Sequence, residues 1–163
     1  TGFTFVAQMR SWLPDPIGGI LWFGVDDAAS NIYVPMYCGI NKVPECYDQH
    51  NGSLLEYSPT SAFWIYNQVA NFAYGKYSYM MQDIKKVQKS WEDDFNTLVP
   101  AIDKVALNLK PEDVIKFLTN FSVTQAENST AAWKKLFEYL LVKYMDGNIK
   151  KEHDGKSKNH GKI

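Results

Sequence analysis

Residues that could act as a nucleophile, a base or a ligand are few in this sequence and far apart. Thr1 is one candidate, because a threonine at a free N-terminus can attack a carbonyl with its own amine serving as the base. Such a site also needs a base partner and oxyanion donors, and the sequence identifies neither. A chain that is simply cut at this position explains Thr1 more economically, and we favour that explanation.

Three charged residues beside predicted strands could contact a ligand. Asp26 and Asp27 could bind a cation or orient a substrate amine, but solvated carboxylates in a strand-to-strand turn give the same pattern. Arg10 could bind a carboxylate, or it could instead pair with Asp15 or stack on Trp12. In both cases we favour the structural explanation over the ligand.

The cysteines and histidines do not form a recognisable catalytic or metal-binding pattern. Cys38 and Cys46 flank a turn at Pro44; a local bridge is conceivable, but we expect two unpaired, buried or half-buried thiols. The sequence contains no phosphate loop, dinucleotide fingerprint or zinc-protease motif, so we predict no cofactor and no metal. The histidines fall in predicted loops or the tail, where we expect surface side chains: His50, His153 and His160.

Composition excludes several classes of protein. The 163 residues carry 17 basic and 18 acidic side chains, without the basic excess typical of a nucleic-acid binder. The longest apolar run, 20–25, is far below the roughly 18 residues that a membrane span requires. We therefore expect neither nucleic acid nor a membrane as a partner. The start of the sequence shows no export signal and no Met, which leaves the compartment open.

The elements that must position these residues are predicted as strands first and helices afterwards. Aromatic and β-branched residues predict strands over 3–9, 20–25 and 31–37, and the short turns between them favour an antiparallel meander. The middle strand is apolar on both faces and should be covered on both sides. A helix is predicted over 62–74, with Pro59 near its start and Gly75 at its end.

The rest of the chain has helical periodicity. Apolar residues spaced by three or four predict one long helix with Trp91 and Phe95 buried at its centre, and Pro100 should kink or split it. Two further helices are predicted over 111–121 and 124–145. Strands grouped before helices predict an α+β fold, with a β meander over 1–57, a helical region over 58–147 and a mobile polar tail over 148–163. The stripe consists of Met80, Ile84, Val87, Trp91, Phe95, Leu98, Ile102, Val105 and Leu109.

Five stretches, spread over nearly the whole chain in one order, carry a resemblance to a known family. They are FVAQMRSWLP at 5–14, GGILWFGVDDA at 18–28, VPMYCG at 34–39, SAFWIYNQVAN at 61–71 and YLLVKYMDG at 139–147. These long, tryptophan-rich strings resemble the bacterial cysteine dipeptidase family of N-terminal-nucleophile (Ntn) hydrolases.

The resemblance implies an αββα sandwich in a protein much longer than this chain. It also implies a dipeptide substrate, attacked by a cysteine at the mature N-terminus whose own amine is the base. This chain matches the C-terminal portion only, so the nucleophile is expected outside it, and Cys38 and Cys46 do not match that position. Arg10 and Asp26 match family strings without an assigned role, and no catalytic residue is carried over.

Two consequences follow for the chain by itself. We expect it to have no dipeptidase activity alone, and to self-associate through the sheet face and strand edge that the missing portion would cover. The alternative is a non-enzymatic helical module for protein interaction, whose tryptophan-rich groove binds a peptide or a partner protein. The Trp- and Tyr-rich helix at 63–74 is itself expected to belong to the core.

Overall fold

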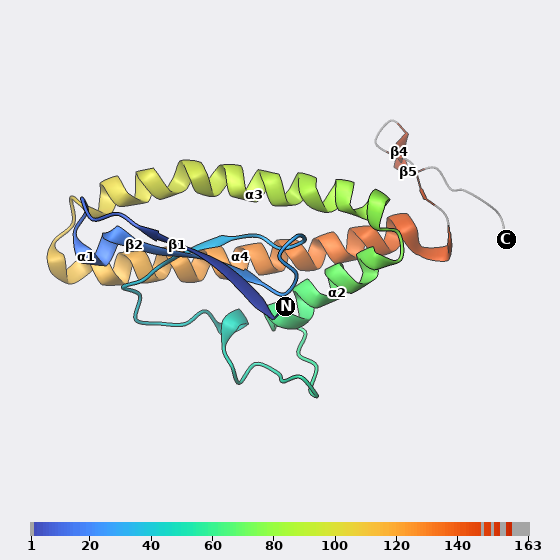
Figure 1. Cartoon of the computed structure of the whole chain (residues 1–163), viewed down its shortest axis with the longest axis horizontal. Coiled ribbons are helices and arrows are strands. Elements are labelled where there is room, and N and C mark those ends of the chain that lie inside the picture. Colours follow the sequence, from blue (N-terminus) through green and yellow to red (C-terminus); the bar gives the residue numbers. More distant parts are fainter. Residues whose placement is uncertain (1, 148, 151, 154–155, 158–163) are drawn as a thin grey trace.

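The computed structural model describes residues 2–147, 149–150, 152–153 and 156–157. It is an α+β fold in which an antiparallel sheet precedes three long helices (Figure 1). Thr1, His160 and most of the predicted tail lie outside the described residues, and the side chain of His153 is not described either. Within that segment, the two-residue strands β4 (Glu152–His153) and β5 (Lys156–Ser157) pair with each other.

The main sheet confirms the predicted meander. Strands β1 (Phe3–Met9), β2 (Gly19–Val25) and β3 (Val34–Tyr37) are antiparallel neighbours in that order, and the short helix α1 (Asp15–Gly18) turns the chain between the first two. β3 is shorter than predicted. Residues before it leave the ladder because Asn31 is held elsewhere: its carbonyl accepts a hydrogen bond of 2.7 Å from the Gln88 side chain.

Three long helices follow, where the sequence suggested four. Helix α2 (Ala62–Tyr74) has the predicted bounds, and α3 (Tyr77–Ala106) is not split at Pro100. Pro100 and Asn96, whose carbonyl loses its donor, are both exposed, so water can replace the missing bond. The two helices predicted after residue 110 are one helix, α4 (Pro111–Tyr144), because the segment between them contains no helix breaker and is anchored by buried Phe121 and Ser122. The described residues also include two short 3-10 helices, η1 (Glu45–Tyr47) before α2 and η2 (Met145–Gly147) after α4.

The apolar stripe of α3 rotates along the helix. Phe95 is fully buried as predicted, whereas Trp91 is only half-buried. Beyond Phe95 the buried positions are no longer those of the stripe: Leu98 is 38% exposed, and Val99 takes its place in the core. After Phe95 the stripe steps by three residues to Leu98, whereas the buried face steps by four to Val99 and again by four to Asp103, so the two follow different sides of the helix from that point on.

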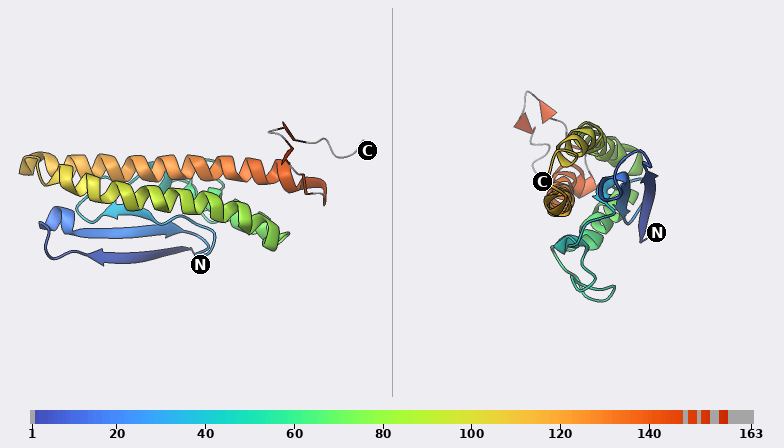
Figure 2. Two further views of the ribbon diagram at one scale, coloured as in Figure 1. Left: turned by 90° about the horizontal axis from the view of Figure 1, so that it is seen from above. Right: turned by 90° about the vertical axis from the view of Figure 1, so that its left-hand side faces the viewer.

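The helices contact the sheet mainly at β3 and at the ends of β2, and they leave β1 outside their cover. β3 packs against α4, while β1 is the strand farthest from the helices (Figure 2). As a result Leu21, Trp22 and Phe23 of the middle strand are only half-buried, and the prediction of cover on both sides is wrong for the centre of this strand. In the described part of the chain, no helix combines the length and the apolar character needed to cross a membrane.

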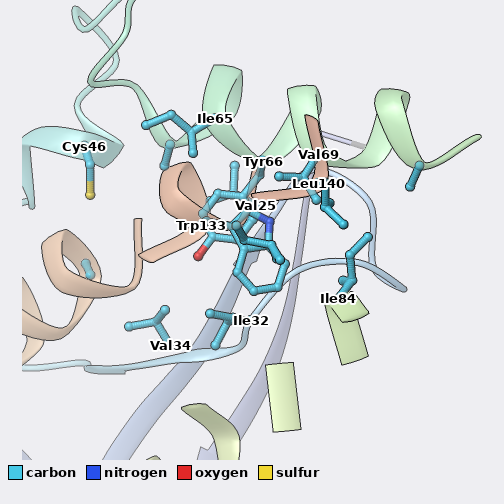
Figure 3. Close-up of a cluster of buried hydrophobic side chains, with 14 of the residues drawn as sticks. Val25, Ile32, Val34, Cys46, Ile65, Tyr66, Val69, Ile84, Trp133 and Leu140 are labelled. Atoms are coloured by element: carbon cyan, nitrogen blue, oxygen red, sulfur yellow. The ribbon is translucent and has the colours of Figure 1, made fainter. Parts of the chain in front are cut away.

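The larger core cluster joins the sheet to α2 and α4 (Figure 3). At its centre the Tyr66 ring stacks on the Trp133 ring with their centroids 5.2 Å apart, and Val25, Ile32 and Val34 pack around them. A second cluster joins the other face of the sheet to the α3–α4 junction. It consists of Ile17, Ile20, Tyr37, Val99, Ala106, Val114, Leu118 and Phe121.

Candidate functional site

Arg10 is buried in a structural network. Its guanidinium forms a two-pronged ion pair with Asp103 of α3, and Nη2 also donates to the Ile17 carbonyl at 2.6 Å. Tyr37 Oη donates to the same carboxylate at 2.7 Å, and burial together with Asp103 raises the pKa of this tyrosine. The expected partners Asp15 and Trp12 are therefore wrong, and Arg10 instead joins the β1–β2 turn to α3.

Asp26 ends β2 in a conformation that few residues adopt. Its φ is +63°, in the left-handed region, and only 8% of the residue is exposed. One carboxylate oxygen accepts a hydrogen bond of 3.2 Å from the Asn67 side chain of α2, and its backbone N–H donates to the Gly2 carbonyl at 3.0 Å. The prediction of a solvated turn carboxylate is wrong for Asp26. It fits Asp27, which is half-buried and caps its own turn by accepting from Ser30 Oγ.

Asn31 makes this end of the sheet unusually tight. A Cβ placed on Gly24 would lie 2.5 Å from Asn31 Nδ2, so only glycine fits at that position. Asn31 is fully buried and donates to Thr4 Oγ1 at 3.3 Å, while its Oδ1 has no hydrogen-bond partner among the described residues. Sequence reasoning missed Asn31 and Asn67. Asn67 is one of three amide side chains in α2, with Gln68 and Asn71, and the sequence alone does not single it out.

Arg10 and Asp26 do not share a site. They lie at opposite ends of β2, and its seven residues span more than about 20 Å at roughly 3.3 Å per residue. Near the Asp26 end of β2, a cavity of about 300 Å³, which we call the end cavity, opens between the sheet, the loop 46–54 and the start of α2. Its apolar wall comprises Phe3, Phe23, Val25, Ala62, Phe63 and Trp64.

The loop that borders the end cavity is held by its own hydrogen bonds. Trp64 Nε1 lies within hydrogen-bonding distance of two loop carbonyls, Ser53 at 3.1 Å and Glu56 at 3.0 Å. Asn51 accepts from Ser58 Oγ at 2.5 Å and donates to the Glu45 carbonyl at 3.0 Å. The end cavity is therefore bounded by fixed walls.

The two cysteines lie in different surroundings. Both thiols are unpaired, as predicted, and Cys46 is buried, but Cys38 is exposed, so the prediction of a buried or half-buried thiol is wrong for Cys38. Cys46 lines the end cavity, but burial, and to a smaller extent the nearby Glu127 carboxylate, raises the pKa of its thiol to about 12. The thiol is therefore protonated at neutral pH, whereas attack requires the thiolate. Its backbone N–H donates to Glu127 Oε1 at 3.1 Å.

The described residues can bind a group in the end cavity, but they do not assemble a catalytic centre. Among them, no three histidine, cysteine or carboxylate side chains come together as a metal site. His50 is exposed and hydrogen-bonds only to Asp48. The apolar face of α2 lies inside the core, as predicted for residues 63–74, and the hollow lies at the start of this helix.

Comparison with protein families gives a match over the part of the chain that forms the sheet and the end cavity. Residues 1–90, which contain the whole main sheet, the loop of the end cavity and α2, match the model of peptidase family C69. The class of protein is therefore that of the peptidases, hydrolases that cleave peptide bonds. The chain belongs to peptidase family C69, which confirms the family resemblance for the four quoted strings that lie within residues 1–90. No curated protein sequence gives a significant match.

Proposed function

We propose that this chain is the C-terminal portion of a dipeptidase whose nucleophile, a cysteine at the mature N-terminus, lies outside it. Membership of a peptidase family supports hydrolysis of peptide bonds. The dipeptide substrate and the N-terminal cysteine come from the resemblance of the sequence strings. Cys46, the one thiol that lines the end cavity, is held protonated by burial, which is consistent with a nucleophile supplied from elsewhere.

The observation that carries this proposal is the open edge of β1. Arg10 N donates to the Gly18 carbonyl, so the even-numbered residues of β1 bond to β2 and the odd-numbered ones direct their N–H and C=O groups outward. No proline and no charged residue interrupts the strand. Natural edge strands usually carry a proline or a charged residue that prevents pairing with another chain. A long edge without them is typical of a strand that pairs with another strand.

The side chains of β1 are exposed as well. Phe3 is 58% exposed, Phe5 56% and Met9 76%, and strand alternation places all three on one face. Together with half-buried Leu21 and Phe23 they form an apolar surface, which we call the open face. An αββα sandwich would place a second sheet on this face and further strands beside β1, which would bury both features.

Expression of the complete open reading frame tests the dipeptidase proposal. We expect the full-length protein to release amino acids from a dipeptide library, and to lose that activity when the cysteine at its mature N-terminus is replaced by alanine. The 163-residue chain alone should be inactive. Turnover by this chain that disappears in Thr1→Ala would overturn the proposal and identify Thr1 as the nucleophile.

A second consequence of the open edge is self-association of the isolated chain. Two copies of β1 can pair edge to edge and bury part of the open face. Ala7→Pro removes an outward N–H without removing a bond to β2, so we expect it to shift sedimentation toward the monomer. Ala7→Thr keeps the N–H and should self-associate like the parent. A parent chain that sediments as an 18.7 kDa monomer at all concentrations would contradict the open edge.

A further inference from the structure

We propose that the end cavity binds the apolar side chain of a short peptide while the Asp48 carboxylate pairs with the free amino group of that peptide. The inference rests on the proposed dipeptidase function and names its substrate class: dipeptides with an unblocked, apolar N-terminal residue. Three properties of the end cavity support it, namely its lining, its charge and its size.

The apolar wall of the end cavity selects against charged side chains. The sheet contributes Phe3, Phe23 and Val25 to this wall, and the start of α2 contributes Phe63 and Trp64. A charged side chain placed against these groups would lose its hydration, and the one carboxylate in the described lining, Asp48, is assigned to the peptide amino group. An aromatic or branched aliphatic side chain would instead exchange water for apolar contacts. The N-terminal residue of the substrate should therefore be one such as Phe or Leu.

The charge at the end cavity is negative and has one source. Asp48 is the only charged residue among the described residues that line it. The backbone N–H of His50 donates to Asp48 Oδ1 at 2.7 Å, and this bond, with the nearby imidazole, lowers the pKa of the carboxyl. Asp48 is therefore ionised at neutral pH. A peptide amino group is positively charged there and is the complementary group.

The size limits the length of the ligand. A volume of about 300 Å³ lies at the lower end of the range for small-molecule pockets, roughly 300–1,000 Å³. This volume suits one large side chain and the adjoining backbone, and not an extended peptide. The Trp64 hydrogen bonds to Ser53 and Glu56 keep the wall in place, so little ordering free energy opposes binding.

Peptide-observed saturation-transfer NMR on the full 163-residue chain tests the inference. Phe-Gly should bind at least about tenfold more tightly than Ala-Gly, because a pocket of this kind discriminates strongly by apolar size. Acetylation of the Phe-Gly amino group should weaken binding about three- to fivefold, the range for a partly exposed ion pair. Asp48→Asn should weaken binding of the free peptide equally and leave the acetylated peptide unaffected.

A filling variant gives an independent check. Ala62→Phe should abolish binding of Phe-Gly, whereas Ala101→Phe, at an exposed alanine of α3, should not change it. If Ala62→Phe fails to fold, the Asp48→Asn variant decides by itself. Asp48 is exposed and lies in a loop, so its replacement leaves the fold intact. Absence of binding, equal affinity for Phe-Gly and Ala-Gly, or an Asp48→Asn variant with parental affinity would each overturn the inference.

The two proposals can fail separately. If the full-length protein hydrolyses dipeptides while the chain shows no preference for Phe-Gly, the end cavity is not the substrate pocket and the dipeptidase stands. If the chain binds Phe-Gly as expected but the full-length protein releases no amino acids, the end cavity stands as a peptide-binding site and the dipeptidase proposal is overturned.

Discussion

Replacing Asp103 by alanine should destabilise the protein more than any single surface change, because it isolates a buried positive charge. In the folded state Arg10 is only 8% exposed, and the Asp103 carboxylate is its counter-ion. The substitution removes both bonds between the guanidinium and the carboxylate, and it also removes the acceptor of the Tyr37 hydroxyl. Arg10 keeps hydrogen bonds to the Ile17 and Gly18 carbonyls, which cannot neutralise its charge.

The size of the effect follows from these contacts. Removing one partner of a buried ion pair typically costs about 3–5 kcal/mol. An unpartnered buried hydroxyl costs about 1–3 kcal/mol by itself, but the two losses share one carboxylate and do not add fully. We therefore expect a loss of about 3–5 kcal/mol out of a total near 5–15 kcal/mol. For a domain of this size, that is a fall in Tm of about 6–20 °C.

Urea denaturation monitored by circular dichroism measures the loss, with Asp93→Ala as the matched control on the same helix. Asp93 pairs with Lys89 at 2.7 Å, but both side chains are well exposed, so its removal should cost under about 1 kcal/mol. The double variant Arg10→Met/Asp103→Leu removes both charges and should recover most of the stability. Equal losses for Asp103→Ala and Asp93→Ala would refute the burial of this ion pair.

Three further predictions concern packing and titration. Phe95→Ala should cost about 3–5 kcal/mol in urea denaturation and Leu98→Ala under about 1 kcal/mol, because only Phe95 is fully buried; similar costs would contradict the rotation of the stripe. Gly24→Ala should cost about 1–3 kcal/mol, because its Cβ would collide with the buried Asn31 amide; an unchanged Tm would show that this amide can move. Burial raises the pKa of the Cys46 thiol from 9.0 to about 12, so the folded state holds this proton more tightly than the unfolded state. The thiol therefore contributes its full stabilisation below pH 9 and loses it as the pH rises from 9 toward 12. Cys46→Ala should lose stability less steeply from pH 9 to 11, and an identical slope would show that the thiol is not shielded.

The sheet and α2 could be predicted closely because their boundaries have local causes. Two prolines and two glycines between the first two strands force a turn, and Gly75 follows the last apolar residue of α2 directly. The prediction of two helices in place of α4 was wrong because this segment has no such local signal for a boundary. No residue in that segment breaks a helix, and the weakened periodicity reflects small polar side chains that are buried for a structural reason. Ser122 is one of them: its Oγ accepts a hydrogen bond of 3.1 Å from the Tyr37 backbone N–H.

The buried carboxylates of α3 could not be predicted from the pattern. Asp83 and Asp103 are both buried although aspartate is normally a surface residue. Their partners are distant in sequence: Asp103 pairs with Arg10, and Asp83 accepts from Lys143 Nζ at 2.7 Å. The end cavity could not be predicted either, because its walls come from the open end of the β1–β2 hairpin, a loop and a helix start that only the fold brings together.

The different surroundings of the two cysteines make the chain suitable for single-site chemical labelling. Cys38 is exposed beside the open face, in a groove lined by Leu21 and Met36, whereas Cys46 is buried and protonated at neutral pH. A maleimide dye or spin label should therefore attach to Cys38 without prior mutagenesis. In a full-length enzyme whose second sheet covers the open face, the same reagent would meet a closed surface. The labelling rate of one native side chain would then report directly whether the sandwich is assembled.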